Sequence, residues 1–351
     1  MAIGARFDAP EPTPAGERQA ALQASGGAIL ERINVSHPIR TRSLARSLPF
    51  AIITALAMLL APPAEAAFSG ENGEIAYARP FKGGYHVFAY DPLTRKSRRL
   101  TSNSLRGDRD SAVAYSPAFG PTGKRIVFLN LVDTKRIGGR RADVYVMRAD
   151  GSHVKRLTRS PAGEFAPTFT ADGKHIAYSL RGKTYLIRSN GRGERTELTA
   201  ALPNGGVGAS FSADGSKVAV ASSDGGDSDI FVLDADGSNP VNVTAASADA
   251  EYSPDFSPDG GRLAFISDRL DFEGDLFTMA ADGSDVVTVH AAPDLEAAEP
   301  AYSPDGTEIA YTTRLSEAGA VRVATIAATG GTPKAIKNSG PISDGPSWGV
   351  K

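Results

Sequence analysis

The fold of this chain is decided by the stretch Tyr252-Ser253-Pro254-Asp255-Phe256-Ser257-Pro258-Asp259-Gly260-Gly261-Arg262-Leu263-Ala264-Phe265. Its centre has the composition of a tight turn, because proline sets φ for the first turn position and glycine accepts the left-handed position that follows. Apolar residues alternate on both sides, with Phe256 before the turn and Leu263 and Phe265 after it. Such alternation around a turn is typical of a β-hairpin.

The same hairpin recurs along the chain. The aromatic residue before the turn, here called the anchor, returns at intervals of 42 to 50 residues. The anchors are Phe119, Phe169, Phe211, Phe256, Tyr302 and Trp348. A glycine stands four residues after each of the first five anchors, and proline stands two residues before every anchor except Phe211. A period of this size indicates a propeller or a solenoid.

Each hairpin is followed by a second pair of strands. In the fourth repeat these are Asp229–Leu233, a turn at Asp236-Gly237, and Asn242–Thr244. Asp-Gly and Asn-Gly dipeptides favour the turns of two-residue hairpins. One repeat therefore supplies four antiparallel strands, which is the content of a propeller blade.

The number of blades follows from the second strand of each repeat. These strands are expected at residues 74–77, 125–128, 175–178, 217–220, 262–265 and 308–311. The first repeat lacks a first strand, whereas residues 345–350 match a first strand and nothing follows them. We expect residues 345–350 to pair with 74–77, because closing the ring leaves no open sheet edge. The predicted fold is all-β, a six-bladed β-propeller over 68–351 with four antiparallel strands per blade.

Residues 40–66 have the pattern of a secretory signal peptide. Three arginines precede the apolar run Phe50–Ala61, and the small-x-small site Ala64-Glu65-Ala66 follows it. The run is too short to cross a bilayer, which needs about 20 apolar residues. An uncleaved anchor or a core helix is the alternative. Residues 1–39 are interpreted as an unstructured leader, on the hypothesis that the start codon lies further downstream. We expect export to the periplasm, the cell envelope or the exterior.

Composition narrows the function classes. The chain holds 38 basic and 40 acidic residues, which argues against a nucleic-acid partner. It contains no cysteine, so disulfides and thiolate metal sites are excluded. No nucleophile elbow, zinc motif or phosphate loop occurs, and the four histidines after residue 66 stand at unrelated repeat positions. Those histidines are His86, His153, His175 and His290. We therefore expect no catalytic residue, metal or cofactor, and a monomer with no membrane span after cleavage.

The candidate site is an acidic rim. Glu164, Glu251, Glu299 and Asp344 stand three to five residues before their anchors, on the side of the blades that carries the longer loops. Binding residues are concentrated on such loops. We predict that these carboxylates surround the channel mouth and receive a basic peptide, an amino terminus or a cation. Solvated carboxylates or caps on backbone amides are the alternative.

Two other charged segments are interpreted as loops. The segment Asn130–Ala142 carries Lys135, Arg136, Arg140 and Arg141 and is predicted to be a solvated loop. Asp224, Asp227 and Asp229 offer oxygen ligands that calcium accepts, but without the spacing of a calcium-binding loop.

The repeat resembles that of the TolB-type propellers. The similarity lies in Pro254–Phe265, in Pro300–Tyr311, in Asp229–Gly237 and in Arg156-Leu157-Thr158. It covers roughly residues 70–351, and it implies a six-bladed propeller in an exported, non-enzymatic, protein-binding protein. TolB itself carries an α/β domain ahead of its propeller, and we expect only the propeller here. Similar repeats occur in prolyl oligopeptidase-type peptidases, whose hydrolase domain has no counterpart in this sequence.

The function expected from the sequence is that of an exported scaffold. It would bind a protein or peptide partner through its loop-rich face and channel mouth. The alternative is a propeller hydrolase or lyase with its site at the channel mouth, which would need titratable groups that converge there. A third, weaker hypothesis is binding of sugar or cell-wall material.

Overall fold

The structure is a computed structural model that describes residues 69–82, 84–102, 113–134, 139–270, 274–291, 297–314, 321–337, 339–340 and 344–351. All of these residues belong to one compact unit, Leu60–Lys351. The predicted leader and signal peptide, residues 1–66, lie outside the described residues.

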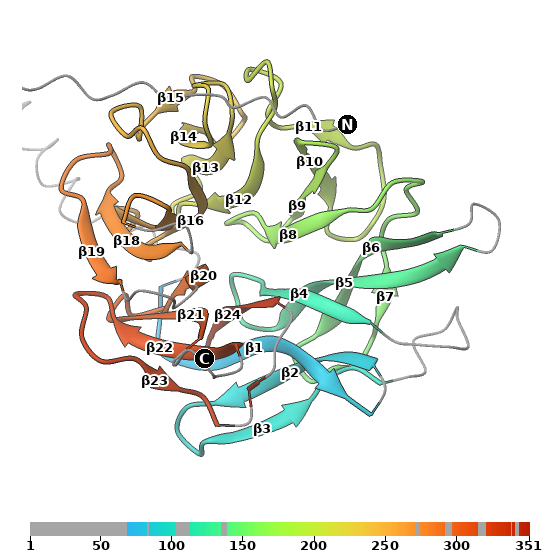
Figure 1. Ribbon diagram of the computed structural model, residues 1–351. Helices are drawn as coiled ribbons and strands as arrows, with labels where there is room; N and C mark the ends of the chain where they lie inside the picture. The colour runs from blue at the N-terminus through green and yellow to red at the C-terminus, as the bar shows by residue number, and fades with distance from the viewer. Residues whose placement is uncertain are drawn as a thin grey trace, which may run out of the picture. The chain divides into compact units, whose positions relative to one another are not determined.

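Six sheets of four antiparallel strands are arranged around a common centre in the described part of the chain (Figure 1). In blade order, and from the innermost strand outward, they are β24(Asp344–Val350), β1(Asn72–Phe81), β2(Gly84–Asp91), β3(Lys96–Arg99); β4(Ala114–Phe119), β5(Arg125–Thr134), β6(Gly139–Arg148), β7(Lys155–Arg156); β8(Phe165–Phe169), β9(His175–Leu180), β10(Lys183–Arg188), β11(Thr196–Glu197); β12(Val207–Phe211), β13(Lys217–Ser222), β14(Asp229–Asp234), β15(Val241–Asn242); β16(Glu251–Phe256), β17(Arg262–Ser267), β18(Asp275–Ala280), β19(Val287–His290); β20(Ala297–Tyr302), β21(Glu308–Arg314), β22(Val321–Ala327), β23(Lys334–Ala335). The predicted six-bladed β-propeller is confirmed.

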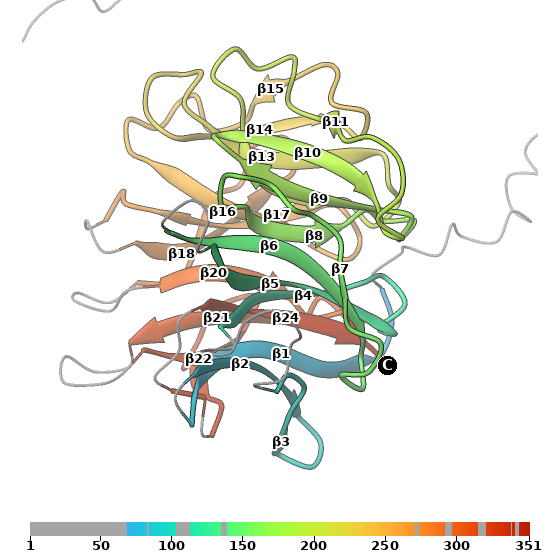
Figure 2. The same cartoon turned by 90° about the vertical axis from the view of Figure 1, so that its right-hand side faces the viewer.

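The ring is closed by the C-terminal strand. β24 pairs antiparallel with β1, with Trp348 opposite Ile75 and Ser347 opposite Ala76. It also contacts β4 and β20, the innermost strands of the two neighbouring blades, and Figure 2 shows β24 between β1 and β4. Blade 1 therefore takes its innermost strand from the far end of the chain, as the repeat pattern predicts.

The short turns owe their shape to a repeated hydroxyl and carboxylate pair. In the fifth blade the Ser257 hydroxyl donates to the Asp259 carboxylate and accepts from the Arg262 N–H. Gly260 then takes the left-handed conformation at φ +70°, which glycine adopts without steric cost. The same arrangement recurs at Ser303-Pro304-Asp305-Gly306 in the sixth blade.

A threonine after the outer strand ties that strand to its neighbour. Thr101, Thr158, Thr199 and Thr244 each accept a hydrogen bond from a backbone N–H of the third strand, over 2.8–3.1 Å. All four threonines are buried, where an unpaired N–H would cost about 1–3 kcal/mol. This contact accounts for the threonine that recurs after the outer strand in these four blades.

Among the described residues the core consists of six clusters, each between two neighbouring blades. The cluster between blades 6 and 1 contains Tyr77, Val323 and Trp348, so it exists only because β24 returns to the start of the ring. All six anchors are buried. Burial of a large apolar side chain contributes about 1.5–3 kcal/mol to the stability of a fold. Since the buried side chains lie between blades, each blade is stabilised mainly by packing against its two neighbours.

Candidate functional site

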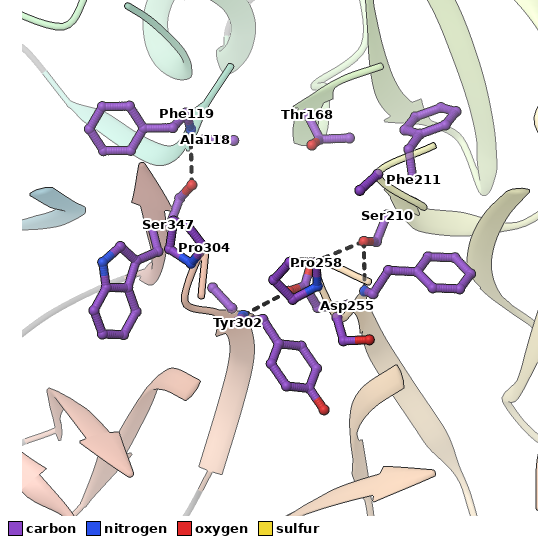
Figure 3. Close-up of a pocket in the computed structure, with 15 residues that line it drawn as sticks. Ala118, Phe119, Thr168, Ser210, Phe211, Asp255, Pro258, Tyr302, Pro304 and Ser347 are labelled. Carbon is purple, nitrogen blue, oxygen red and sulfur yellow. Dashed lines mark hydrogen bonds between the residues drawn. The ribbon is translucent and has the colours of Figure 1, made fainter. Parts of the chain in front are cut away.

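A narrow channel passes between the innermost strands. The residue immediately before each anchor faces it, and the enclosed volume at this level is about 90 Å³. The six channel-facing residues are Ala118, Thr168, Ser210, Asp255, Ala301 and Ser347. Figure 3 shows Ser210, Asp255 and Ser347 pointing toward neighbouring strands around this space.

Three of these side chains link one blade to the next. Ser347 accepts a hydrogen bond from the Phe119 N–H at 2.9 Å, and Ser210 accepts one from the Phe256 N–H at 3.1 Å. Asp255 accepts from the Tyr302 N–H at 2.9 Å and from the Ser210 hydroxyl at 3.0 Å. These bonds are drawn as dashed lines in Figure 3. Those of Ser210 and Asp255 form a continuous polar seam across blades 4, 5 and 6, whereas that of Ser347 joins blades 1 and 2.

Asp255 carries the acidic group in this part of the channel. Burial within the ring raises its pKa to about 7, although the Tyr302 N–H and the Ser210 hydroxyl favour the charged form. In this position the other blades carry alanine, serine or threonine. Sequence reasoning missed Asp255 as a functional residue, and its departure from that pattern is the signal that could have revealed it.

The channel widens toward the face that carries the longer loops. A bulge interrupts the pairing of the innermost strands there, and Ser116, Ala166, Gly208, Ser253 and Glu299 have φ between +45° and +68°. These five residues line a mouth of about 180 Å³. Its lining also includes four prolines that directly follow them in the sequence, Pro117, Pro167, Pro254 and Pro300. The bulges bend the strand ends and so shape the opening.

The four predicted rim residues do not share one environment. Glu164 and Glu251 are only 3% and 0% exposed, inside their blades. Glu299 lines the mouth, and its side chain lies against Gly345, where any larger residue would collide with it. Asp344 begins β24, but its side chain lies outside the described residues. Of the three described side chains, only that of Glu299 faces the mouth.

Glu164 belongs to a buried polar cluster. Its carboxylate accepts from the Thr158 hydroxyl and, at 3.1 Å, from the Val144 N–H. Asp143, which pairs with Arg156, is close enough for its charge to act on Glu164. Burial chiefly, and the charge of Asp143 in addition, raise the pKa of Glu164 to about 7. The cluster caps backbone amides, which is the alternative that the sequence left open for this residue.

Glu251 is held in a comparable way in the fifth blade. One carboxylate oxygen accepts from the Ser247 and Ser267 hydroxyls at 2.8 and 2.9 Å and from Arg269 at 3.0 Å. Ser267 and Arg269 belong to the same blade, and Ser247 lies in the connection from blade 4. Because Glu251 binds these partners in the interior, it acts on the packing of its own blade and of that connection.

The other candidate residues are separated from one another. Asp229 binds Asn242 and Thr244, whereas Asp224 accepts from the Asn204 N–H. In the part of the chain that the structure describes, no group of three His, Cys, Asp or Glu side chains could hold a metal ion. The prediction of a loop over Asn130–Ala142 is wrong, because β5 continues to Thr134 and β6 begins at Gly139. Lys135 and Arg136 lie outside the described residues, and Arg141 lies beside Asp143.

The described histidines, His86, His153, His175 and His290, lie away from the channel. None of them lines its narrow part or its mouth. His86 lies 3.3 Å from the Thr101 hydroxyl, and His290 is 2.9 Å from the Tyr311 hydroxyl. Within the described ranges no helix is long and apolar enough to cross a membrane.

The repeats match known proteins. A family model described as the TolB beta propeller domain matches residues 189–350. Two curated proteins named "Protein TolB homolog", from Chlorobium luteolum and Chlorobium chlorochromatii, are 30% and 27% identical over 190 and 206 residues. These alignments cover 53% and 58% of this chain but only 42% of each relative, so the chain spans less than half the length of these relatives.

Solved structures of the same kind agree in fold. TolB from Acinetobacter baumannii superposes with a TM-score of 0.62 at 20% identity, covering 80% of this chain and 67% of that one. A putative TolB from Agrobacterium tumefaciens gives 0.58 at 19% identity, covering 76% and 88%. At these identities the structures support the fold alone.

Six closed blades around a polar channel define a six-bladed β-propeller. Its repeats are similar to those of the TolB beta propeller domain over residues 189–350, in line with the resemblance at Pro254–Phe265.

Proposed function

We propose that this chain is an exported, non-enzymatic scaffold that binds a protein or peptide partner over the channel mouth on its loop-rich face. The observation that carries the proposal is the mouth itself. It is an opening of about 180 Å³ ringed by the bulges of all the innermost strands, and it narrows to about 90 Å³ one residue further in. A side chain or a chain end fits such a funnel, while the surrounding loops offer contact area for the rest of a partner.

The charge at the mouth favours a basic group. Glu299 lines it, and Asp255 lies deeper in the channel. A lysine, an arginine or an amino terminus would therefore find a carboxylate at the entrance. Glu164 and Glu251 are buried inside their blades. The proposed acidic rim therefore consists of Glu299 and, as a prediction, Asp344.

Export is the second part of the proposal. It is supported by the signal-peptide pattern at residues 40–66. The periplasm, the cell envelope and the exterior are all consistent with this pattern.

A propeller hydrolase or lyase is the alternative. It needs a nucleophile or an acid and a base in mutual reach. Asp255 is the carboxylate that lines the narrow channel, and its described neighbours there are the Ser210 hydroxyl and the Tyr302 N–H. Both bonds hold blades together, which favours a structural role for the group.

Capture from a cell-envelope extract tests the binding proposal. The propeller is immobilised and the captured proteins are identified by mass spectrometry, for the parent and for Glu299→Lys. Glu194→Lys is the matched control, since Glu194 is an exposed carboxylate in a turn on the opposite face. Loss of a specific protein with Glu299→Lys and its retention with Glu194→Lys would support the proposal. Equal capture by all three proteins would contradict it.

A further inference from the structure

A second and larger cavity lies on the face of the short turns, between blades 5 and 6. Its volume is about 930 Å³, which is within the range of sites that hold ligands. The turn Ser257–Asp259 and the turn Pro304–Gly306 form two of its sides. Val287, at the start of the outer strand β19, and Ala328, in the turn after β22, lie beside it. Pro258, Tyr302 and Pro304 also line the narrow channel, so they form the wall between the two spaces.

This cavity combines an apolar wall with negative charge. Pro258, Val287, Tyr302 and Pro304 supply the wall, and Val287 remains 38% exposed. Asp259, Asp285 and Asp305 supply three carboxylates. One arginine, Arg262, lines the cavity and pairs with Asp285 at 2.6 Å. The net charge of these side chains therefore favours a cation attached to an apolar group.

The first described residues of the chain lie at the edge of this cavity. Ser69 and Gly70 are among its lining residues. The Gly70 N–H donates to the Pro304 carbonyl at 3.2 Å, and Asn72 exchanges two hydrogen bonds with Asp305 at 2.9 and 3.1 Å. Phe68 precedes Ser69 in the chain, and adjacent Cα atoms are about 3.8 Å apart, so a segment attached to Ser69 has the reach to enter the cavity.

We propose that residues 67 and 68 occupy this cavity once the chain is cut after Ala66. The ring of Phe68 packs on the wall of Pro258, Val287 and Pro304, and the new α-ammonium group of Ala67 faces the carboxylates. The tether makes docking intramolecular, at an effective concentration on the order of millimolar. The proposal rests on the export part of the proposed function, because only processing creates this amino group.

Fluorescence quenching tests the docking of Phe68. A chain produced to begin at Ala67 receives Phe68→Trp, and its quenching by acrylamide is compared with that of Leu93→Trp, whose position is 75% exposed. The one native tryptophan, Trp348, is buried, and its emission is measured in the parent protein and subtracted. We expect the introduced indole at position 68 to be quenched several-fold less than the one at position 93. Equal quenching would overturn the proposal.

A matched pair of variants shows whether the cavity is responsible. Val287→Lys places a charge in the cavity, whereas Val241→Lys changes the equivalent position of blade 4, which is also exposed. Val287→Lys should restore quenching of the introduced indole and Val241→Lys should not. With native Phe68, Val287→Lys should lower Tm more in the chain that begins at Ala67 than in one that begins at Ser69. Equal losses in the two chains would also overturn the proposal.

The amino group and the processing step are tested separately. Acetylation of the Ala67 amine should increase quenching of the introduced indole, and no change would refute the role of the charge. Mass spectrometry of the exported protein reports its first residue. Failure of export would appear there as an uncut chain, while failure of docking would appear in the quenching of the chain that begins at Ala67.

Discussion

Replacement of Asp255 by asparagine should remove a pH-dependent loss of stability. Its ordinary pKa is 3.8, and burial raises it to about 7 in the folded protein. Between these two values the folded state holds the proton and the unfolded state does not. The free energy of unfolding therefore falls as the pH rises from about 4 through about 7.

The magnitude follows from the two pKa values. At 1.36 kcal/mol for each unit of pKa, the full difference between the two pKa values corresponds to roughly 4 kcal/mol of unfolding free energy. Asp255 is half-buried against the channel, and water there screens its charge, so we expect about 2 kcal/mol. Asparagine keeps the shape, an acceptor for the Tyr302 N–H and a donor for Ser210.

Urea unfolding at pH 4 and pH 8 measures this effect, from the midpoint and the slope. Asp255→Asn should be within about 0.5 kcal/mol of the parent at pH 4 and about 2 kcal/mol more stable at pH 8. An Asp255→Asn variant that is equally destabilised at both pH values would refute the reasoning, because the carboxylate would then act through its hydrogen bonds alone.

Three further substitutions test other parts of the structure by the same unfolding measurement. Glu164→Gln should be more stable than the parent by about 2–3 kcal/mol at pH 8 and nearly equal at pH 4, since burial raises the pKa of Glu164 to about 7; a constant difference would contradict the assigned pKa. Trp348→Ala should lose about 3–5 kcal/mol, because the indole is buried between blades 6 and 1; a loss below about 1 kcal/mol would argue against that packing. Gly237→Ala should cost about 2 kcal/mol more than Gly226→Ala, because both have positive φ but only at Gly237 would a Cβ meet the Leu198 carbonyl; equal costs would count against this contact.

The fold could be predicted because the repeat is marked at several offsets at once. The anchor, the turn glycine and the proline recur together, and each has a separate structural reason in the blade. The closing strand was predictable for the same reason, since Pro346 and Trp348 reproduce the first-strand pattern after the last complete blade.

The environment of the rim residues was not predictable by counting offsets alone. In an unbroken strand, a residue five positions before the anchor would face the same side as the residue one position before it, which lines the channel. The one-residue bulge reverses this alternation, so Glu164 and Glu251 lie on the buried side with their anchors. The proline within the strand was the available signal, because proline inside a sheet indicates an edge or a bulge.

The role of Asp255 as a link between blades was not predictable for a different reason, although its departure from the small residues at the equivalent positions marks it as unusual. It stands inside the very stretch that defines the hairpin, and a single sequence offers no sign that its carboxyl bridges Ser210 of blade 4 and Tyr302 of blade 6. That contact depends on the angle between neighbouring blades, which is a property of the closed ring.

Ring closure by the last strand is the claim on which the channel, its mouth and the second cavity all depend. A designed disulfide tests it most directly, because the chain has no cysteine of its own. Asn72 and Val350 are direct partners in the β1–β24 pairing, and Cα atoms of such partners lie within the reach of a disulfide. Oxidation of the Asn72→Cys and Val350→Cys double variant should form an intramolecular bond in nearly every folded molecule. Free thiols that persist in the folded, oxidised protein would contradict the closed ring.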